Sequence, residues 1–477
     1  MRRFRFVWLA IASAPLAAAA VHGARAQYGG TLRVETRANV HALDPTATPL
    51  DRVDAAAARR IESLVFDTLT HVDPAGGLRP RLATSWESDR GAARWRFHLR
   101  PGVALHDGTA LEAWQVAAAL RAVSAGWSTS IDGDAVLIES QRPRPELPWE
   151  LADARFAVAV RRSSSSVVGT GPFRLERIEA SRIILRAHDA CWSARPFLDA
   201  IEIMMGRAGA AQLTDLESNR ADIVDVSPAD ARRLTDHGLR VITTRPLQGY
   251  ALVFEPHKAD AASDRLREMF AGSLDRSAIA SVLLQGRAEP AVALLPSWVS
   301  GYPEAFAGRT LTRTAKAADR LPPEQRTVSL RVDSADPVAR LIGDRIAVDA
   351  REVGFTVTVQ APAGLAPRPD VRLVRITLDA NIPTLVLAGL VAELGPRALS
   401  LATAEQPPSA DAPLAAALAF ERALLQGSMI VPVVRVPDLY GLADGVEAFS
   451  GEPVDATGTW NFANVSLHAA ARSRGRP

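Results

Sequence analysis

A strand–helix–strand pattern between residues 327 and 359 constrains the fold of this chain more than any other feature. Residues 328–332 and 355–359 alternate apolar and polar side chains, a period of two that is typical of strands. The Asp336-Pro337 pair opens the segment between them, in which apolar residues recur at helical spacing. Because two strands joined by a helix pair in parallel through a right-handed crossover, this pattern predicts an α/β protein with a parallel sheet.

The length of the chain limits how many domains it can form, and its charge limits the partners that can be expected. With 477 residues, the chain is too long for one hydrophobic core and should divide into two or three domains. Its formal net charge is +2, but four arginines lie within the first 26 residues, so the remainder carries a charge of −2. A near-neutral chain without a basic stripe interleaved with aromatic residues gives no reason to expect nucleic acid as a partner.

The first 26 residues have the pattern of a secretory signal peptide. Basic residues precede an apolar run over residues 6–21, and Ala24-Arg25-Ala26 is a small-x-small cleavage pattern, so the mature chain should begin at Gln27 in the periplasm. The Arg2-Arg3 pair leaves the twin-arginine route open beside general secretion. The only cysteine, Cys191, is far from this leader, so we expect neither a lipid anchor nor an internal disulfide. No later segment offers about 18 uninterrupted apolar residues, the length that a membrane span requires.

Residues 94–120 predict a strand, a turn and a helix in succession. Aromatic residues and a leucine alternate with basic residues along the strand, and Asp107-Gly108 supplies the turn. Apolar residues then recur at helical spacing beyond Thr109, which we expect to cap that helix. His106 and its acidic neighbour have the composition of a metal or acid–base pair. No second cluster of ligands lies nearby in the sequence, so we interpret them as part of a structural turn.

Residues 78–116 also contain a string of residues that is more specific than its periodicity. The string comprises Leu78, Pro80, Leu82-Ala83, Ser85-Trp86-Glu87, Trp95, Phe97, Leu99-Arg100, Gly102-Val103 and His106-Asp107-Gly108-Thr109. It resembles the signature of the extracellular solute-binding proteins of family 5, receptors that deliver peptides, nickel and similar cargo to ABC importers. Looser matches run from Gly29 to Leu467, among them Leu43-Asp44-Pro45 and Gly169-Thr170-Gly171-Pro172-Phe173. The resemblance implies an α/β, two-lobe periplasmic-binding-protein (venus-flytrap) fold of type II, with an extra subdomain inserted in the first lobe.

The resemblance also implies a division of the chain into domains. It places a signal peptide at 1–26, the first lobe at 27–60 and 166–250, an inserted subdomain that carries the signature at 61–165, the second lobe at 251–440, and a return to the first lobe with a basic tail at 441–477. The polar run from Ser163 to Ser166 is interpreted as a surface crossing between lobes.

One ligand contact is implied directly by the resemblance. Family members that bind peptides hold the ligand extended between the lobes, and an aspartate binds its α-ammonium group. A carboxylate suits this role because a cation taken out of water needs a fixed counter-charge. The resemblance places Asp379 at this position, although Ile376 and Ala380 stand where the family has an aromatic residue and a tyrosine. A loop-capping role for Asp379 stays an equal alternative.

Three further residues are candidates for the cleft. Tyr250 stands near the position of cleft tyrosines in the family, and His41 and Thr46 flank the Leu-Asp-Pro turn. For Tyr250 the alternative is a strand tyrosine packed at an edge between the lobes.

The function that the resemblance implies is that of a periplasmic solute-binding protein of an ABC importer. Such a protein closes its lobes on a small-molecule or peptide ligand, with peptide the commonest cargo, and presents the closed form to an inner-membrane ABC permease complex. We expect a monomer without a cofactor, and no bound metal because no histidine cluster indicates a metal site.

Two other functions are considered. A hydrolase on the same scaffold finds no support, because the sequence has no Gly-x-Ser-x-Gly elbow, no His-Glu-x-x-His motif and no cysteine in a catalytic context. We therefore do not expect an enzyme. The remaining alternative is a degenerate, receptor-derived sensor or partner-binding protein that no longer serves transport, a hypothesis motivated by the missing cleft aromatic residues and by a second lobe that is shortened before Leu414.

Overall fold

The computed structural model describes the chain from residue 28 to residue 468 with internal gaps. The segments left out are 47–51, 74, 124–125, 164–165, 256–260, 301–316, 334–335, 361–368, 379–381, 395–411, 413, 449–450 and 456. The predicted signal peptide, residues 1–26, and the candidate Asp379 therefore lie outside the described residues.

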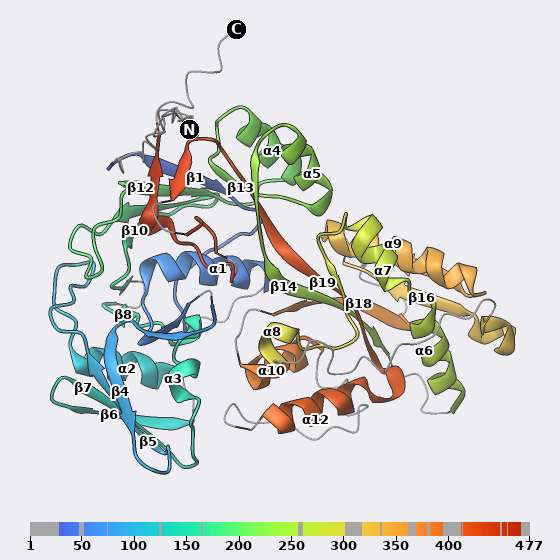
Figure 1. The fold of residues 1–477 in the computed structure, drawn as a ribbon, viewed down its shortest axis with the longest axis horizontal. Coiled ribbons are helices and arrows are strands. Elements are labelled where there is room, and N and C mark those ends of the chain that lie inside the picture. Colours follow the sequence, from blue (N-terminus) through green and yellow to red (C-terminus); the bar gives the residue numbers. More distant parts are fainter. Residues whose placement is uncertain are drawn as a thin grey trace, which may run out of the picture.

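Among the described residues, eleven strands form one mixed sheet that runs through both lobes (Figure 1). Its order is β10-β11-β12-β1-β13-β19-β14-β18-β16-β17, and β15 pairs with β19. In that order the bounds are Phe173–Ile178, Arg182–Ala187, Ala200–Met204, Thr31–Glu35, Ile223–Asp225, Ile430–Leu442, Arg240–Phe254, Val371–Thr377, Thr327–Arg331 and Thr356–Gln360, with β15 at Glu289–Pro290. Parallel pairs occur in both halves of the sheet, between β1 and its neighbours β12 and β13 and between β16 and its neighbours β17 and β18.

Strands β14 and β19, the longest of the sheet, pair antiparallel and connect the two halves of the molecule. Their pairing spans residues 240–253 and 430–442, with register shifts near its centre, where Pro246 stands opposite Pro437. Because proline has no N–H group, neither residue donates a hydrogen bond to the ladder. The two crossing strands are therefore more weakly joined at their centre than at their ends.

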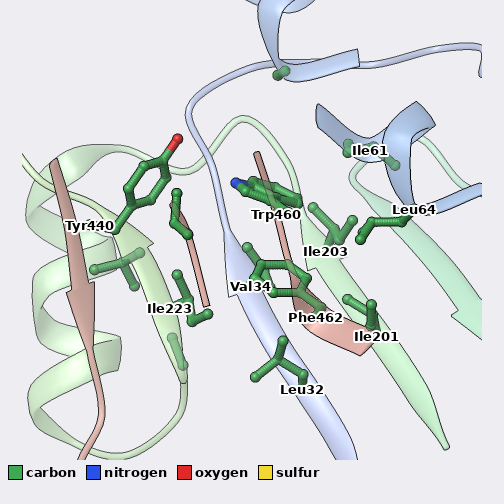
Figure 2. Packing of buried hydrophobic residues seen from close by; sticks show 14 of the residues in the cluster. Leu32, Val34, Ile61, Leu64, Ile201, Ile203, Ile223, Tyr440, Trp460 and Phe462 are labelled. Atoms are coloured by element: carbon green, nitrogen blue, oxygen red, sulfur yellow. The ribbon is translucent and has the colours of Figure 1, made fainter. Parts of the chain in front are cut away.

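One half of the sheet carries the core of the first lobe (Figure 2). Ile61 of α1, Leu32 of β1 and Phe462 belong to one buried cluster, and the rings of Trp460 and Phe462 stack with their centroids 4.9 Å apart. The C-terminal residues of the described chain thus pack beside its first strand. The helices of this cluster are α1 (Arg52–Val65), α4 (Gly209–Glu217) and α5 (Pro228–Asp236).

The other half of the sheet is covered on both faces. Tyr250, Leu252 and Phe254 of β14 belong to one buried cluster, and the intervening Ala251 and Val253 belong to another. This alternation follows from the period of two along a strand. The first cluster includes α6 (Ala261–Ser273) and α9 (Pro337–Glu352), and the second includes α8 (Ser297–Ser300), α10 (Pro383–Leu394) and α12 (Leu414–Leu425), on opposite sides of β14 and β18 in Figure 1.

The strand–helix–strand prediction is confirmed in this second half. Strands β16 and β17 flank α9 in sequence and pair in parallel. The Asp336 side chain accepts hydrogen bonds from the backbone N–H groups of Val338 at 2.9 Å and Ala339 at 3.1 Å, and so caps α9. The domain boundaries derived from the resemblance stay a prediction.

A separate four-stranded sheet, in the order β4-β5-β7-β6, carries the remaining large core. Trp95, Phe97 and Leu99 are buried on one face of β5, as the sequence predicts. The predicted cap at Thr109 is wrong: the helix begins later, with Glu112 as its N-cap, because Glu112 and Gln115 form a capping box. The elements are β4 (Ala83–Ser88), β5 (Arg94–Leu99), β7 (Ala135–Ser140), β6 (Trp127–Asp132) and α2 (Ala113–Ala122).

Short elements complete the described part of the chain. Two-stranded sheets are formed by β2 (Thr70–Val72) with β3 (Leu78–Pro80), β8 (Val160–Arg161) with β9 (Val167–Val168), and β20 (Val446–Ala448) with β21 (Val465–Leu467). Short helices are α3 (Leu147–Glu150) and α7 (Arg276–Ala278).

His106 has a structural environment in the turn that follows β5. Its Nδ1 atom accepts a hydrogen bond from the Gly169 N–H at 3.3 Å, and its Nε2 atom lies 3.1 Å from the Gly171 carbonyl oxygen. The ring also meets the His188 ring edge-on at 4.9 Å between centroids. Both ring nitrogens are therefore engaged by backbone groups, which requires the neutral imidazole with its proton on Nε2.

We expect acid to destabilise the protein through His106. Burial is the main cause that lowers the pKa of His106 from 6.5 to about 4. Between these values the unfolded chain binds a proton that the folded protein excludes, so stability is full above pH 6.5 and falls as the pH drops through 4. The loss is about 3 kcal/mol. Urea unfolding at neutral and acidic pH measures it.

His106→Gln is expected to lose less stability on acidification than the wild type, because no imidazole is left to protonate. His237→Gln, at the exposed C-cap of α5, controls for the loss of a histidine. An equal acid-induced loss in wild type and His106→Gln would contradict the role assigned to His106.

Candidate ligand-binding cavity

A cavity of about 1340 Å³ lies where the crossing strands β14 and β19 join the two lobes. The first lobe contributes α1 and the segment that follows β1, and the region of α3 contributes Trp149 and Arg155. The second lobe contributes the start of α9, the strand β18 and one side of α10. A large cavity whose walls come from two lobes is a usual location for a small-molecule site.

Tyr250 lies in the cavity wall, but its hydroxyl group already has a partner. The ring is 2% exposed, and the hydroxyl donates a hydrogen bond to Asp336 Oδ2 at 2.8 Å. Burial and the neighbouring Asp336 carboxylate raise the pKa of Tyr250 well above 10. Tyr250 thus connects β14 to the capped start of α9. A direct contact of Tyr250 with ligand stays a prediction.

Among the described residues, the candidates His41 and Thr46 do not join Tyr250 in the lining of the cavity. His41 and Thr46 are exposed and are not among the lining residues. Thr46 donates hydrogen bonds from its backbone N–H and its hydroxyl to Asp44 Oδ1, at 3.0 and 2.7 Å. These hydrogen bonds close the Leu-Asp-Pro turn, and Arg161 forms an ion pair with Asp44 Oδ2 at 2.5 Å. A ligand-binding role of His41 and Thr46, like that of Asp379, stays a prediction.

Arginine is the abundant charged residue of this cavity, and sequence reasoning missed it. Nine arginines line it among the described residues: Arg37, Arg59, Arg60, Arg81, Arg155, Arg245, Arg331, Arg372 and Arg375. They come from segments far apart in the chain, and no local pattern of charge connects them. Seven carboxylic side chains share the lining: Asp54, Glu62, Asp153, Asp225, Asp333, Asp336 and Asp438.

Asp438 connects α1 to both crossing strands at the cavity floor. Arg60 of α1 forms an ion pair with its Oδ2 atom, and Gln248 of β14 donates to its Oδ1 atom. The Asp438 N–H also donates to the Thr244 hydroxyl oxygen at 2.9 Å. Both carboxylate oxygens are therefore occupied by protein groups that hold the crossing in place.

Glu62 carries only part of a negative charge at neutral pH. It is 6% exposed, and burial raises its pKa to about 7 against the opposing effects of the Asp44 N–H and Arg59. The Asp44 N–H donates to Glu62 Oε1 at 3.0 Å. A group with this pKa is only partly ionised near pH 7.

The described residues offer neither a metal centre nor a membrane-spanning helix. No group of three or more His, Cys, Asp or Glu side chains in the described ranges is arranged to hold a metal ion. Nor does any helix in the described part of the chain combine the length and apolar character of a membrane span.

Sequence comparison relates the chain to transport proteins. The family model of the bacterial extracellular solute-binding proteins, family 5 Middle, matches residues 77–368. The peptide transport periplasmic protein SapA of Salmonella typhimurium is 25% identical over 369 residues, which is 64% of this chain and 65% of SapA. This chain thus spans just under two thirds of the length of that relative.

Structural comparison gives the same architecture. NikA from Staphylococcus aureus, solved in complex with Ni(L-His)2, superposes with a TM-score of 0.73 at 15% identity over 92% of this chain and 100% of the NikA chain. AppA from Bacillus subtilis, an oligopeptide-binding protein solved with a nonapeptide, has a TM-score of 0.70 at 15% identity over 93% and 100% of the two chains. These neighbours confirm the two-lobe, type II fold that the sequence predicts.

Proposed function

Since the chain belongs to the bacterial extracellular solute-binding proteins of family 5, we propose that it binds a small solute between its lobes and delivers it to an ABC importer. The cavity at the lobe crossing is the observation that carries this proposal. Its walls come from both lobes, so a solute bound there contacts both and stabilises the closed form. Peptide is the first ligand class to test, because SapA and AppA are both named for peptides.

Hinge bending at the crossing strands is the motion that this function requires. The facing prolines Pro246 and Pro437 interrupt the ladder between β14 and β19. A site with fewer ladder hydrogen bonds bends at lower cost than a regular two-stranded ribbon. The bend lies beside Asp438 and Gln248, which line the cavity, so ligand contacts and hinge are adjacent.

The proposed place of action is the periplasm, after export and removal of residues 1–26. The leader pattern in the sequence supports this location, and SapA is itself named as a periplasmic protein. The proposed partner is an inner-membrane permease complex that recognises the closed form.

Solute binding is expected to stabilise the protein and to make it more compact. A ligand at a hundred times its Kd adds about 2.7 kcal/mol to the free energy of unfolding. The full-length chain is exported, purified and refolded to remove any bound solute, and then screened by thermal unfolding against di- to pentapeptides, opines, sugars and nickel complexes. Small-angle scattering of the responding complex should give a smaller radius of gyration than that of the free protein.

A filled-cavity variant provides the control for this screen. Gly389 of α10 lines the cavity and has no atom within 4 Å of an added Cβ, so Gly389→Phe places a ring in the cavity and is expected to abolish stabilisation by ligand. Gly209→Phe, at an equally open glycine outside the cavity, should respond as the wild type does. Absence of stabilisation by every class, or equal stabilisation in both variants, would contradict solute binding in this cavity.

A further inference from the structure

If the proposed function holds, the charge of the cavity lining indicates which chemical class of solute binds there. The described lining contains nine arginines and seven carboxylic residues, and Glu62 is only partly ionised at neutral pH. A wall with excess positive charge raises the local concentration of anions and repels cations. Which solute binds then depends on how far the charged groups are already paired within the protein.

Several of the cavity carboxylates are already occupied. Asp336 caps α9 with one oxygen and accepts the Tyr250 hydroxyl with the other. Asp438 pairs with Arg60 and Gln248, as described above. Asp225 Oδ2 accepts the Thr36 hydroxyl at 2.8 Å and the Arg37 N–H at 3.1 Å. A cationic group of a solute would have to displace these internal hydrogen bonds, at a cost in free energy.

Arg37 and Arg375 are the cavity arginines whose side chains are least committed. Arg37 gives Asp225 only its backbone N–H, and its guanidinium group has no carboxylate partner among the described residues. Arg375 Nη1 lies 3.7 Å from Asp336 Oδ2, too far for a hydrogen bond, and that oxygen already accepts the Tyr250 hydroxyl. Both groups are therefore available to an incoming anion.

These two arginines belong to opposite lobes and line the same cavity. Arg37 follows β1 in the first lobe, whereas Arg375 lies on β18 of the second lobe, directly opposite Tyr250 in the strand ladder. Arg375 lies close to the Tyr250 hydroxyl, because both face the same Asp336 Oδ2 atom, and Arg37 lines the same cavity from the first lobe. A solute that reaches both walls of the cavity thus meets one guanidinium group from each lobe.

We propose that the cavity binds an anionic solute with two or more carboxylate groups, which Arg37 and Arg375 clamp from opposite lobes. A guanidinium group presents its N–H donors in a planar fork that matches a carboxylate, and such charge-assisted pairs are the stronger hydrogen bonds of proteins. An anion that bridges the two arginines also neutralises their mutual repulsion. Closure of the lobes is therefore coupled to binding of a negative charge.

The experiment compares three dipeptides of equal length and different charge: Glu-Glu, Gln-Gln and Lys-Lys, with citrate as a polycarboxylate that is not a peptide. Binding to the refolded full chain is measured by calorimetry and thermal unfolding. We expect Glu-Glu or citrate to bind at least tenfold more tightly than Gln-Gln, and Lys-Lys not to bind. Arg37→Gln and Arg375→Gln should each weaken binding of the anion at least tenfold.

Arg186→Gln is the matched control, because Arg186 pairs with Glu176 on the edge of the sheet, outside the cavity. It should bind the anion as the wild type does, and near-equal melting temperatures of the free variants would exclude unfolding as a cause. Tighter binding of Gln-Gln or Lys-Lys than of either anion would overturn the anion proposal and leave solute binding standing. Unchanged anion affinity in Arg37→Gln and Arg375→Gln would overturn the clamp. If neither anion bound while a neutral solute of the wider screen stabilised the protein, the anion proposal would also be overturned. If no solute bound at all, the proposed function itself would be overturned.

Discussion

Asp67→Ala is expected to lower the free energy of unfolding by about 3–5 kcal/mol, the range for removing one partner of a buried ion pair. Asp67 is 1% exposed and follows α1. Its Oδ1 atom accepts a hydrogen bond from Arg81 Nε at 2.6 Å, and its Oδ2 atom accepts from the Thr170 hydroxyl and Trp192 Nε1, both at 2.8 Å. The substitution leaves a guanidinium, a hydroxyl and an indole N–H without their acceptor.

The same network lowers the pKa of Asp67, which fixes the direction of its pH dependence. Burial by itself raises the pKa, but Arg81, Trp192 and Thr170 together bring it below the ordinary value of 3.8. Its stabilising contribution is therefore present above pH 3.8 and is lost as the pH falls through the lower, folded-state value. Asp67→Ala should thus remove part of the acid sensitivity that the wild type has in this range.

Chemical unfolding followed by tryptophan fluorescence measures the loss in Asp67→Ala. The control is Glu176→Ala, which removes an exposed ion pair to Arg186 and is expected to change stability by less than about 1 kcal/mol. If Asp67→Ala were no more destabilised than this control, the buried network would not be what joins the segments around α1.

Gly169→Ala is the second substitution with a large expected effect, about 3 kcal/mol or more. A Cβ atom at this position would lie 2.1 Å from the Val65 carbonyl oxygen and 2.6 Å from Phe66 Cδ1. The obstacle is backbone at the end of α1, so the clash cannot be relieved by a change of rotamer. Gly169 also donates to His106 Nδ1, so any shift of its backbone disturbs that contact.

Gly209→Ala is the matched control for this substitution. Gly209 is the first residue of α4 and has no atom within 4 Å of an added Cβ. Alanine there should be neutral or stabilise by about 0.4–1 kcal/mol, because it reduces the entropy of the unfolded chain. Thermal unfolding of the two variants in parallel would refute the close-approach argument if Gly169→Ala proved as stable as Gly209→Ala.

The Gly-Thr-Gly-Pro-Phe turn at residues 169–173 contains a structural constraint that the sequence alone does not reveal. The sequence shows Gly169 and Gly171 only as part of a match to the family, and the structure shows why glycine is needed at both positions. Neither glycine has a positive φ angle; both allow a close approach to α1, where an added Cβ would meet Val65 and Leu64. The sequence cannot reveal this, because the neighbour is about a hundred residues away in the chain.

At shorter range, the sequence also leaves the start of a helix undecided, as Thr109 and Glu112 show. Both are possible caps for the helix that follows, and the sequence alone favours threonine. In the structure, Thr109 donates from its backbone N–H and its hydroxyl to Asp107 Oδ1, at 3.0 and 2.7 Å, and closes a turn. The helix then begins at the Glu112–Gln115 capping box. Competition between two local hydrogen-bonded arrangements decided the boundary.

Local periodicity allowed the sequence by itself to determine the α/β class, the parallel β16–α9–β17 unit and the buried face of β5. Each of these patterns is complete within a few turns of helix or one strand pair, and a short window contains it. Residues 78–116 added the family and, through it, the two-lobe fold. Only the tertiary structure decided the composition of the cavity, because its arginines come from segments between residues 37 and 375 that long-range packing brings together. Charge pairing and burial are properties of that assembled surface, so no window of sequence contains them.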